Sequence, residues 1–229
     1  MTQRIAVFAS GGGTNLQALI DHFHPQSTPA ARVELVVANR PGIGALDRAA
    51  AAGVPGLVLR PADTPPAELL RVLEKHRVDL IVLAGYLQLV PTEVIARYHE
   101  RVVNIHPALL PAFGGLGMYG LRVHRAVLEA GARVSGATVH LVDDEYDRGR
   151  ILAQWPVPVL PDDTPEALAA RVLRVEHRLL PVTLEALLGV RAPTTPRDAL
   201  AFGLLHAEAP GPSDIANLLH TEQREPAPS

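Results

Sequence analysis

The sequence predicts an α/β fold, a mainly parallel, twisted sheet with helices on both faces in a Rossmann-like arrangement. Short apolar runs of strand length alternate with segments of helical length along most of the chain. One run, residues 80–83, is apolar throughout, which is typical of a strand buried on both faces. Glycine-rich or polar segments follow several of these runs, and such sheets bind ligands beyond the carboxyl ends of their strands.

The first half of the chain predicts four strands, each followed by a helix. The first run is apolar and β-branched and ends at three consecutive glycines, so the chain must turn there. The expected strands are residues 4–9, 33–38, 56–59 and 80–83. The expected helices are residues 15–24, 45–52, 68–76 and 93–98.

The second half predicts a fifth strand and then a change of pattern. Residues 102–105 form the strand and residues 121–129 a helix; a final antiparallel or mixed pair and a long helix follow, at residues 137–142, 151–159 and 166–188. From about residue 191, prolines and polar residues dominate. We therefore expect a catalytic domain over residues 1–190 and a partly disordered C-terminal extension over residues 191–229.

Composition excludes several classes of protein. The 24 acidic and 21 basic residues give a formal net charge of −3, whereas nucleic-acid and membrane-surface binders usually carry a basic excess. The chain has no cysteine, so disulfides and thiolate metal sites are impossible. The N-terminal stretch is too short for a signal peptide, and no apolar run reaches the ~18–20 residues of a membrane span. We expect a cytoplasmic protein.

Four polar segments are expected to meet at one edge of the sheet. They follow the first, fourth, fifth and sixth predicted strands and read SGGGTN, AGYLQLV, NIHP and DDEYDRG. In parallel sheets, carboxyl strand ends share an edge and build the ligand site. This convergence is stronger evidence for an active site than any single motif.

The glycine-rich turn predicts an anion site. Glycines let the backbone approach a ligand closely, and the following helix offers free N–H groups and the positive end of its dipole. Gly13, Thr14 and Asn15 supply these groups. Because a P-loop lysine and a dinucleotide fingerprint are both missing, a monophosphate fits best. The alternative is a tight turn capped by Thr14 or Asn15.

Asn104 and His106 predict a catalytic centre at the end of the fifth strand. Residues two apart on a strand point to the same face, so both side chains can face one ligand. A histidine carries a proton near neutral pH, and an amide N–H stabilises a developing oxyanion. A lone histidine here would more often be structural, but its pairing with Asn104 favours function.

The acidic loop, residues 143–147, leaves two interpretations open beside a solvated turn. One of its carboxylates can orient the catalytic histidine and favour its charged form. A metal site is the other interpretation, although Tyr146 occupies a position that would suit a ligand. His140 is expected to be a packed, hydrogen-bonded core residue, and His124 a surface residue beside the glycine-rich segment GGLGMYG, which can act as a lid.

Several segments together resemble the folate-dependent glycinamide ribonucleotide (phosphoribosylglycinamide) formyltransferases of purine biosynthesis. They are SGGGTNLQAL, DLIVLAGYLQLV, VVNIHPALLPAF, GATVHLVDDEYDRGRILAQ and RVEHRLLP, between about Arg4 and Leu188. The resemblance implies the formyltransferase fold and transfer of the formyl group of 10-formyltetrahydrofolate to the amine of 5-phosphoribosylglycinamide. It also implies that no metal is required.

The resemblance also assigns residues. Asn104, His106 and Asp147 would be catalytic, Gly13, Thr14 and Asn15 would hold the phosphate, and Glu176 would reach the ribose. The folate would lie between one wall of Leu87, Gln88, Leu89 and Val90 and a facing wall of Asp143, Asp144, Glu145, Tyr146 and Asp147, with Asn104 also in contact. The expected partners are these small molecules, with no nucleic acid and no membrane, and the expected assembly is a monomer or homodimer.

Three other functions are alternatives. A formyltetrahydrofolate hydrolase would share the catalytic residues but carry an additional N-terminal domain. A methionyl-tRNA formyltransferase would require a further C-terminal domain with a basic surface, which the acidic, proline-rich tail does not supply. A sugar-phosphate binding module would explain the glycine-rich turn but not Asn104, His106 and Asp147.

Overall fold

The fold is described from a computed structural model that covers residues 2–27, 29, 31–60 and 63–188. The expected C-terminal extension, residues 191–229, lies outside the described residues, and so does the boundary proposed at residue 190. None of the helices in the described part of the chain is long and apolar enough to cross a membrane.

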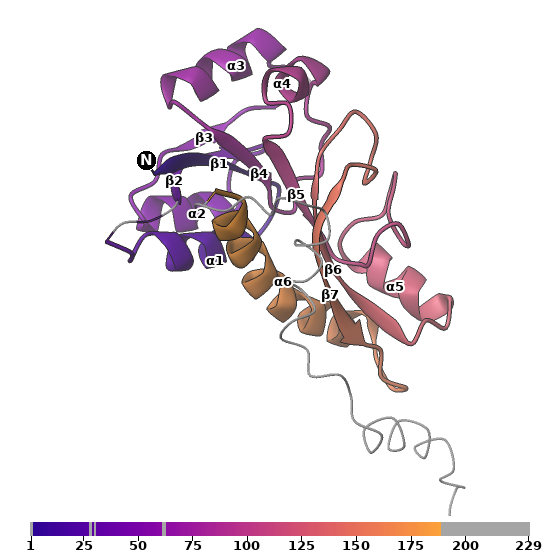
Figure 1. Cartoon of the computed structure of the whole chain (residues 1–229). Helices are drawn as coiled ribbons and strands as arrows, with labels where there is room; N and C mark the ends of the chain where they lie inside the picture. The colour runs from indigo at the N-terminus through magenta and orange to yellow at the C-terminus, as the bar shows by residue number, and fades with distance from the viewer. Residues whose placement is uncertain (1, 28, 30, 61–62, 189–229) are drawn as a thin grey trace, which may run out of the picture.

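A seven-stranded sheet with the order β3-β2-β1-β4-β5-β6-β7 forms the centre of the molecule (Figure 1). The strands are β1 (Gln3–Ala9), β2 (Ala31–Ala38), β3 (Gly56–Val58), β4 (Leu80–Leu83), β5 (Val102–His106), β6 (Val134–Leu141) and β7 (Ile151–Pro158). β1 to β5 pair in parallel, whereas β6 runs antiparallel to both β5 and β7. The predicted mainly parallel sheet with a final antiparallel pair is confirmed.

Helices cover both faces of the sheet, as predicted. They are α1 (Thr14–Phe23), α2 (Gly44–Ala51), α3 (Pro66–Lys75), α4 (Thr92–Arg97), α5 (Leu121–Glu129) and α6 (Pro165–Leu188). Ile5 and Val7 of β1 pack in one core with residues of α1, α2, α5 and α6. Ala6 and Phe8 point the other way, into a second core with α3 and α4. This alternation is the two-residue period of a strand buried on both sides.

The turn between β1 and α1 requires glycine at one position. Gly13 precedes α1 with φ 73°, in the left-handed region that favours glycine. A Cβ on Gly13 would lie 2.6 Å from the Cα of Ala45, at the start of α2. The turn is therefore fixed by backbone packing against α2, and it places the start of α1 at the carboxyl edge of β1.

The prediction that four carboxyl strand ends meet at one edge of the sheet is wrong for β6. Because β6 is antiparallel to β5, its carboxyl end does not share the edge at which β1, β4 and β5 end: Leu141 pairs with Val103, whereas His106 pairs with Thr138. The loop after β6 starts at the opposite edge and turns back, so that Asp147 still approaches His106. The convergence is real, but strand direction does not explain this fourth segment.

Candidate active site

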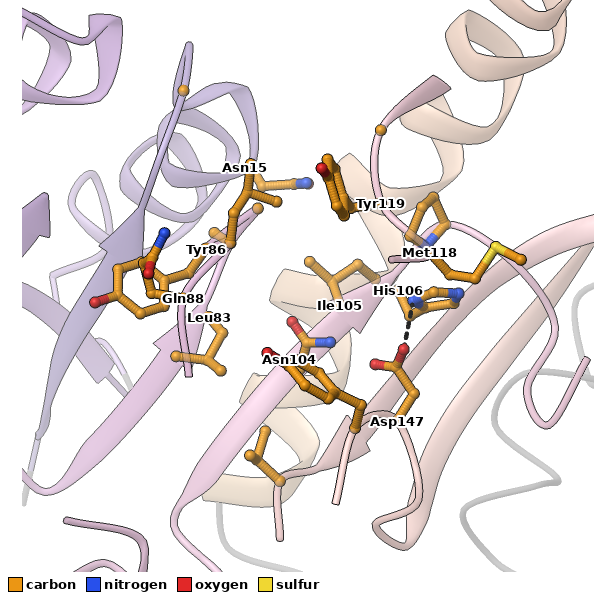
Figure 2. A pocket seen from close by; sticks show the side chains of 18 of the residues that line it. Asn15, Leu83, Tyr86, Gln88, Asn104, Ile105, His106, Met118, Tyr119 and Asp147 are labelled. Atoms are coloured by element: carbon orange, nitrogen blue, oxygen red, sulfur yellow. Dashed lines mark ion pairs between the residues drawn. The ribbon is translucent and has the colours of Figure 1, made fainter. Parts of the chain in front are cut away.

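A cavity of about 870 Å³ lies along the carboxyl ends of the parallel strands. Its walls come from the turn after β1, the segments after β4 and β5, residues 115–122, the loop after β6, and α6. Figure 2 shows side chains from these segments facing a common space, with Asn15 on one side and Asp147 on the other. The volume is in the range of small-molecule sites, ~300–1,000 Å³.

His106 lies almost completely buried in the wall of this cavity. Its Nε2 is 2.9 Å from the backbone oxygen of Phe113. A carbonyl oxygen only accepts, so Nε2 carries the hydrogen and donates it. The other ring nitrogen, Nδ1, lies 3.5 Å from Oδ2 of Asp147, as the dashed line in Figure 2 marks. A proton taken up at Nδ1 would therefore face a carboxylate.

Burial and neighbouring charges act in opposite directions on the pKa of His106. Burial lowers it and is the largest effect, and His140 nearby also lowers it. Asp147 and the Phe113 carbonyl raise it by favouring imidazolium, but the net pKa lies below the ordinary value. Asp147 thus acts in the expected direction, toward the charged ring, but burial outweighs it.

Asp147 contacts one backbone donor and two imidazole rings. The backbone N–H of Gly115 donates to its Oδ2 at 2.8 Å, and Nε2 of His140 lies 3.5 Å from its Oδ1. Burial alone would raise the pKa of Asp147, but the contacts with His140, Gly115 and His106 together hold that pKa below its usual range. Asp147 is therefore an anion over the whole neutral range, next to His106.

His140 connects Asn104 to this cluster. It pairs with Asn104 across β5 and β6, and its Nε2 is 3.0 Å from Nδ2 of Asn104. Its Nδ1 lies 2.8 Å from the carbonyl oxygen of Leu141, so Nδ1 carries a hydrogen. In the neutral ring Nε2 is then an acceptor, and it fixes which end of the Asn104 amide is the donor.

The start of α1 forms a second polar site in the same cavity. Gly13, Thr14 and Asn15 line it, and no side chain caps the helix. The alternative of a turn capped by Thr14 or Asn15 is thus wrong. The N–H groups of the first turn remain available to an anion, as the glycine-rich motif predicts.

Glu176 of α6 completes this second site. The Nδ2 of Asn15 donates to Oε2 of Glu176 at 2.6 Å, and both side chains are buried. The Oδ1 of Asn15 is buried and has no hydrogen-bond partner in the described part of the chain. Burial raises the pKa of Glu176, and the hydrogen bond from Asn15 lowers it less than burial raises it. The predicted phosphate and ribose residues thus come together.

The two predicted folate walls also line the cavity. Leu87 and Leu89 are exposed to it at 47% and 56%, while Val90 is buried. Gln88 belongs to the same wall (Figure 2). Oγ of Ser10 accepts a hydrogen bond from the N–H of Leu87 at 2.9 Å, which ties this wall to the turn after β1. Residues 143–147 line the cavity as well.

The comparison with known proteins gives the family. A family model described as formyl transferase matches residues 3–184. The chain belongs to the formyl transferase family. The match spans every strand of the sheet and each segment that lines the cavity.

Relatives within the family carry more specific names. The chain is 49% identical over 183 residues to a chloroplastic phosphoribosylglycinamide formyltransferase of Arabidopsis thaliana, which covers 77% of this chain and 62% of the relative. It is 33% identical to the phosphoribosylglycinamide formyltransferase of Bacillus subtilis, over 82% of this chain and 96% of the relative. The chain thus spans about three fifths of the length of the plant relatives, 61% and 62%.

Solved structures of the family have the same fold. A glycinamide ribonucleotide transformylase of Geobacillus kaustophilus superimposes with a TM-score of 0.76 at 42% identity, over 82% of this chain and 100% of that chain. A formyltetrahydrofolate deformylase of Pseudomonas syringae superimposes with a TM-score of 0.73 at 28% identity, over 82% of this chain and 62% of that chain. The fold is therefore common to proteins named for different activities.

Two histidines of this site were not recognised from the sequence. His140 is packed and hydrogen-bonded as predicted, but it also lines the cavity and contacts Asn104. The expectation of a surface position for His124 is wrong, because α5 buries it with Val123 and Val127. The signal for His140 was a polar side chain between two apolar residues, Val139 and Leu141, of a predicted strand.

Burial also determines the charge of His124. Its Nδ1 is buried and has no hydrogen-bond partner within residues 2–27, 29, 31–60 and 63–188. Burial, with a smaller contribution from nearby His106, lowers its pKa to about 4. His124 is therefore neutral in the folded protein near pH 7. Among the described residues, no group of three or more histidine or acidic side chains is placed to hold a metal ion.

Proposed function

We propose that this protein transfers the formyl group of 10-formyltetrahydrofolate to the amine of 5-phosphoribosylglycinamide, a step of purine biosynthesis. The observation that carries the proposal is the cluster of Asn104, His106 and Asp147 in one cavity with the anion site at Gly13 to Asn15. A folate-dependent hydrolysis alone would not need the second site. The names of the relatives support transfer of a formyl group to phosphoribosylglycinamide.

The phosphate of the ribonucleotide is placed at the start of α1. The N–H groups of Gly13, Thr14 and Asn15 and the dipole of α1 favour a dianion there. Glu176 accepts hydrogen bonds from the ribose hydroxyls, while Asn15 holds the carboxylate from behind. The glycinamide amine then points along the cavity toward Asn104.

The folate is placed between the two exposed walls. Its pterin lies against residues 87–90, with the backbone of residues 143–147 on the other side. Asn104 lies between these walls at the end of β5 and contacts the formyl group. This arrangement brings the formyl carbon between the amine and Asn104.

Attack of the amine produces an oxyanion. The bond from the amine nitrogen to the formyl carbon forms, and the carbonyl electron pair moves to oxygen. Because His140 accepts one hydrogen of the Asn104 amide, the second is free to donate to this oxygen. The oxyanion also favours the charged form of His106, which offsets the effect of burial on its pKa.

Collapse of the intermediate requires a proton transfer. The attacking nitrogen becomes acidic and loses a proton to the cluster of Asp147 and His106. The bond between the formyl carbon and N10 of the folate then breaks, and N10 receives the proton. Asp147 keeps its charge through this cycle because its donors lower its pKa. General acid–base assistance of this kind contributes typically ~10²–10⁴-fold to a rate.

We further propose that the reaction proceeds without a metal, in the cytoplasm, by a monomer or homodimer whose partners are small molecules and not nucleic acid or membrane. The chemistry supports the first point, because the amide of Asn104 and a charged His106 supply the electrophilic assistance that a metal would otherwise give.

One assay separates this function from its rivals. Release of tetrahydrofolate from the formyl cofactor should depend on the glycinamide ribonucleotide, and the product should carry the formyl group. Equal release without the ribonucleotide would indicate a hydrolase. Binding of the ribonucleotide with no turnover would indicate a sugar-phosphate binding module, and formylation of methionyl-tRNA would indicate the tRNA enzyme.

A further inference from the structure

A buried polar cluster behind the catalytic residues has no role in the proposed function so far. It consists of Thr138 on β6, which is completely buried, and Gln154 on β7. Neither side chain belongs to the described lining of the cavity. Both contact the segment that follows His106: the Thr138 hydroxyl donates to the oxygen of Ala108 at 2.6 Å, and Nε2 of Gln154 donates to the oxygen of Leu110 at 2.8 Å.

Every polar hydrogen of this cluster is used. The Thr138 oxygen accepts the N–H of Leu110 at 3.0 Å and the second hydrogen of the Gln154 amide at 3.0 Å. Two residues of the loop are thus fixed by hydrogen bonds to two adjacent strands. Such a fully satisfied buried network holds its backbone in one arrangement.

The fixed segment carries the groups that orient the catalytic side chains. Three residues after Leu110, the oxygen of Phe113 accepts the hydrogen of His106 Nε2. Two residues further, the N–H of Gly115 donates to Asp147. A shift of residues 108–110 would displace both contacts together.

We propose that Thr138 and Gln154 are positioning residues: they hold residues 108–113 so that the Phe113 carbonyl fixes the ring orientation and the tautomer of His106. The proposal deepens the proposed function, since it concerns the same catalytic centre. Neither residue touches substrate. They act through the backbone of the loop.

The charged and titratable groups around His106 make this testable by titration. The ring faces the Asp147 carboxylate from the loop after β6, His140 from β6 and His124 from α5. Of its neighbours, Asp147 and the Phe113 carbonyl favour the imidazolium. Displacement of the carbonyl should therefore move the His106 titration to lower pH, and displacement of Gly115 should free Asp147 to move as well.

The test compares Thr138→Val with Thr138→Ser and Gln154→Met. Valine keeps the shape of threonine but cannot pair with Leu110 or Ala108, whereas serine keeps the hydroxyl. Thr138→Val and Gln154→Met should lower kcat by about 10-fold or more, up to ~10²-fold, as for a small displacement of a catalytic group. The KM values of both substrates should remain unchanged. Thr138→Ser, which retains the hydroxyl, should keep the wild-type pH profile of kcat.

Ser135 provides a matched control on the same strand. It is also buried, but its hydroxyl has no hydrogen-bond partner among the residues that the structure describes. Ser135→Ala should therefore leave kcat, its pH profile and the His106 titration as in the wild type. Loss of activity in Ser135→Ala equal to that in Thr138→Val would show that any change in β6 has this effect, and would overturn the proposal.

The titration of His106 by NMR in the substrate-free protein is the deciding measurement. It requires no turnover, so it tests the positioning role even if the proposed reaction proves wrong. A wild-type His106 titration in Thr138→Val and Gln154→Met would overturn the proposal. If Thr138→Val does not fold, Gln154→Met decides alone, since Gln154 is only partly buried.

Discussion

Two carboxylates in the same cavity, the partly buried Asp147 and the buried Glu176, have opposite protonation tendencies. Asp147, beside His106, receives the backbone N–H of Gly115 and lies against two imidazoles, and its pKa is lowered. Glu176, at the other polar site, receives one hydrogen bond from Asn15, and its pKa is raised. Burial opposes charge at both sites, so the number and type of donors decide the sign. The anion is thus permanent at Asp147 and costly at Glu176.

The difference agrees with the two proposed tasks. A catalytic cluster must hold a negative charge before the substrate arrives, because that charge supports the imidazolium. A ribose-binding carboxylate gains its remaining donors from the hydroxyls of the ligand, so it is incompletely satisfied in the free protein. Binding energy from the ribonucleotide then offsets the burial of Glu176.

The largest expected effect tests the catalytic side of this comparison. Asp147→Asn removes the charge that favours the His106 imidazolium, so His106 should titrate at lower pH and kcat should fall by ~10²–10⁴-fold. His106→Ala and Asn104→Ala should be similarly impaired with substrate binding largely kept. The pH profile of kcat and the His106 NMR titration check this. Near-wild-type turnover with an unmoved titration would make Asp147 an ordinary loop carboxylate.

The second expected effect concerns protein stability and arises at His124, next to the catalytic cluster. His124 has a folded pKa of about 4 against 6.5 in the unfolded chain. The unfolded state therefore binds more protons between these values, and stability is lost as the pH falls below 6.5. By pH 5 the wild type should lose about 2 kcal/mol of unfolding free energy that His124→Phe does not lose.

Urea unfolding at pH 7 and pH 5 measures that difference. The other titrating groups contribute equally to wild type and variant, so the double difference isolates His124. Identical pH dependence in the two proteins would mean that His124 becomes charged without unfolding α5. The control is His99→Phe, which replaces an exposed histidine with the same side chain.

The ribonucleotide site and the catalytic cluster also differ in how far the sequence predicts them. The turn at Gly13 and the start of α1 are local, so a short motif was enough to place an anion site there. Asn104 and His106 followed from alternation along one strand. Asp147 depended on a resemblance, because its approach to His106 joins segments 41 residues apart across an antiparallel reversal.

The roles of His140, His124 and Thr138 lie beyond such reasoning. His140 and Thr138 have partners on other elements, and the pairing of β5 with β6 decides which residues meet, whereas His124 depends on how α5 packs. Alternation along the sequence shows which residues share one face of a strand. It does not show the register or the direction of that strand relative to its neighbour. Thr138 and His140 share one face of β6, and this register places them beside His106 and Asn104.

A third effect tests Glu176 at the ribonucleotide site. Glu176→Gln keeps the size of the side chain but weakens its hydrogen bonds to ribose hydroxyls, because charged acceptors bind more strongly. The KM of the ribonucleotide should rise on the order of 10-fold, with kcat and the KM of the folate nearly unchanged. Steady-state kinetics with each substrate varied in turn measures this. A fall in kcat without a change in KM would place Glu176 in the chemical step instead.

The smallest effect has the most informative sign. The folded pKa of Glu176 is raised, so the folded state binds the extra proton, and the stability that this group contributes is present at low pH and lost as the pH rises through the folded pKa. The folded pKa of Asp147 is lowered, so its contribution is present above the unfolded pKa and lost as the pH falls.

At pH 7, Glu176→Gln should therefore unfold at a higher urea concentration than the wild type, and Asp147→Asn at a lower one. The gain in Glu176→Gln should shrink as the pH falls through the raised folded pKa of the wild-type carboxyl, toward the unfolded value of 4.5. Saturating ribonucleotide should reduce or reverse this gain, since the ligand supplies donors to the glutamate and not equally to the glutamine. Two variants with the same sign at pH 7 would show that both carboxylates are satisfied alike in the free protein, and the contrast between the two sites would then be lost.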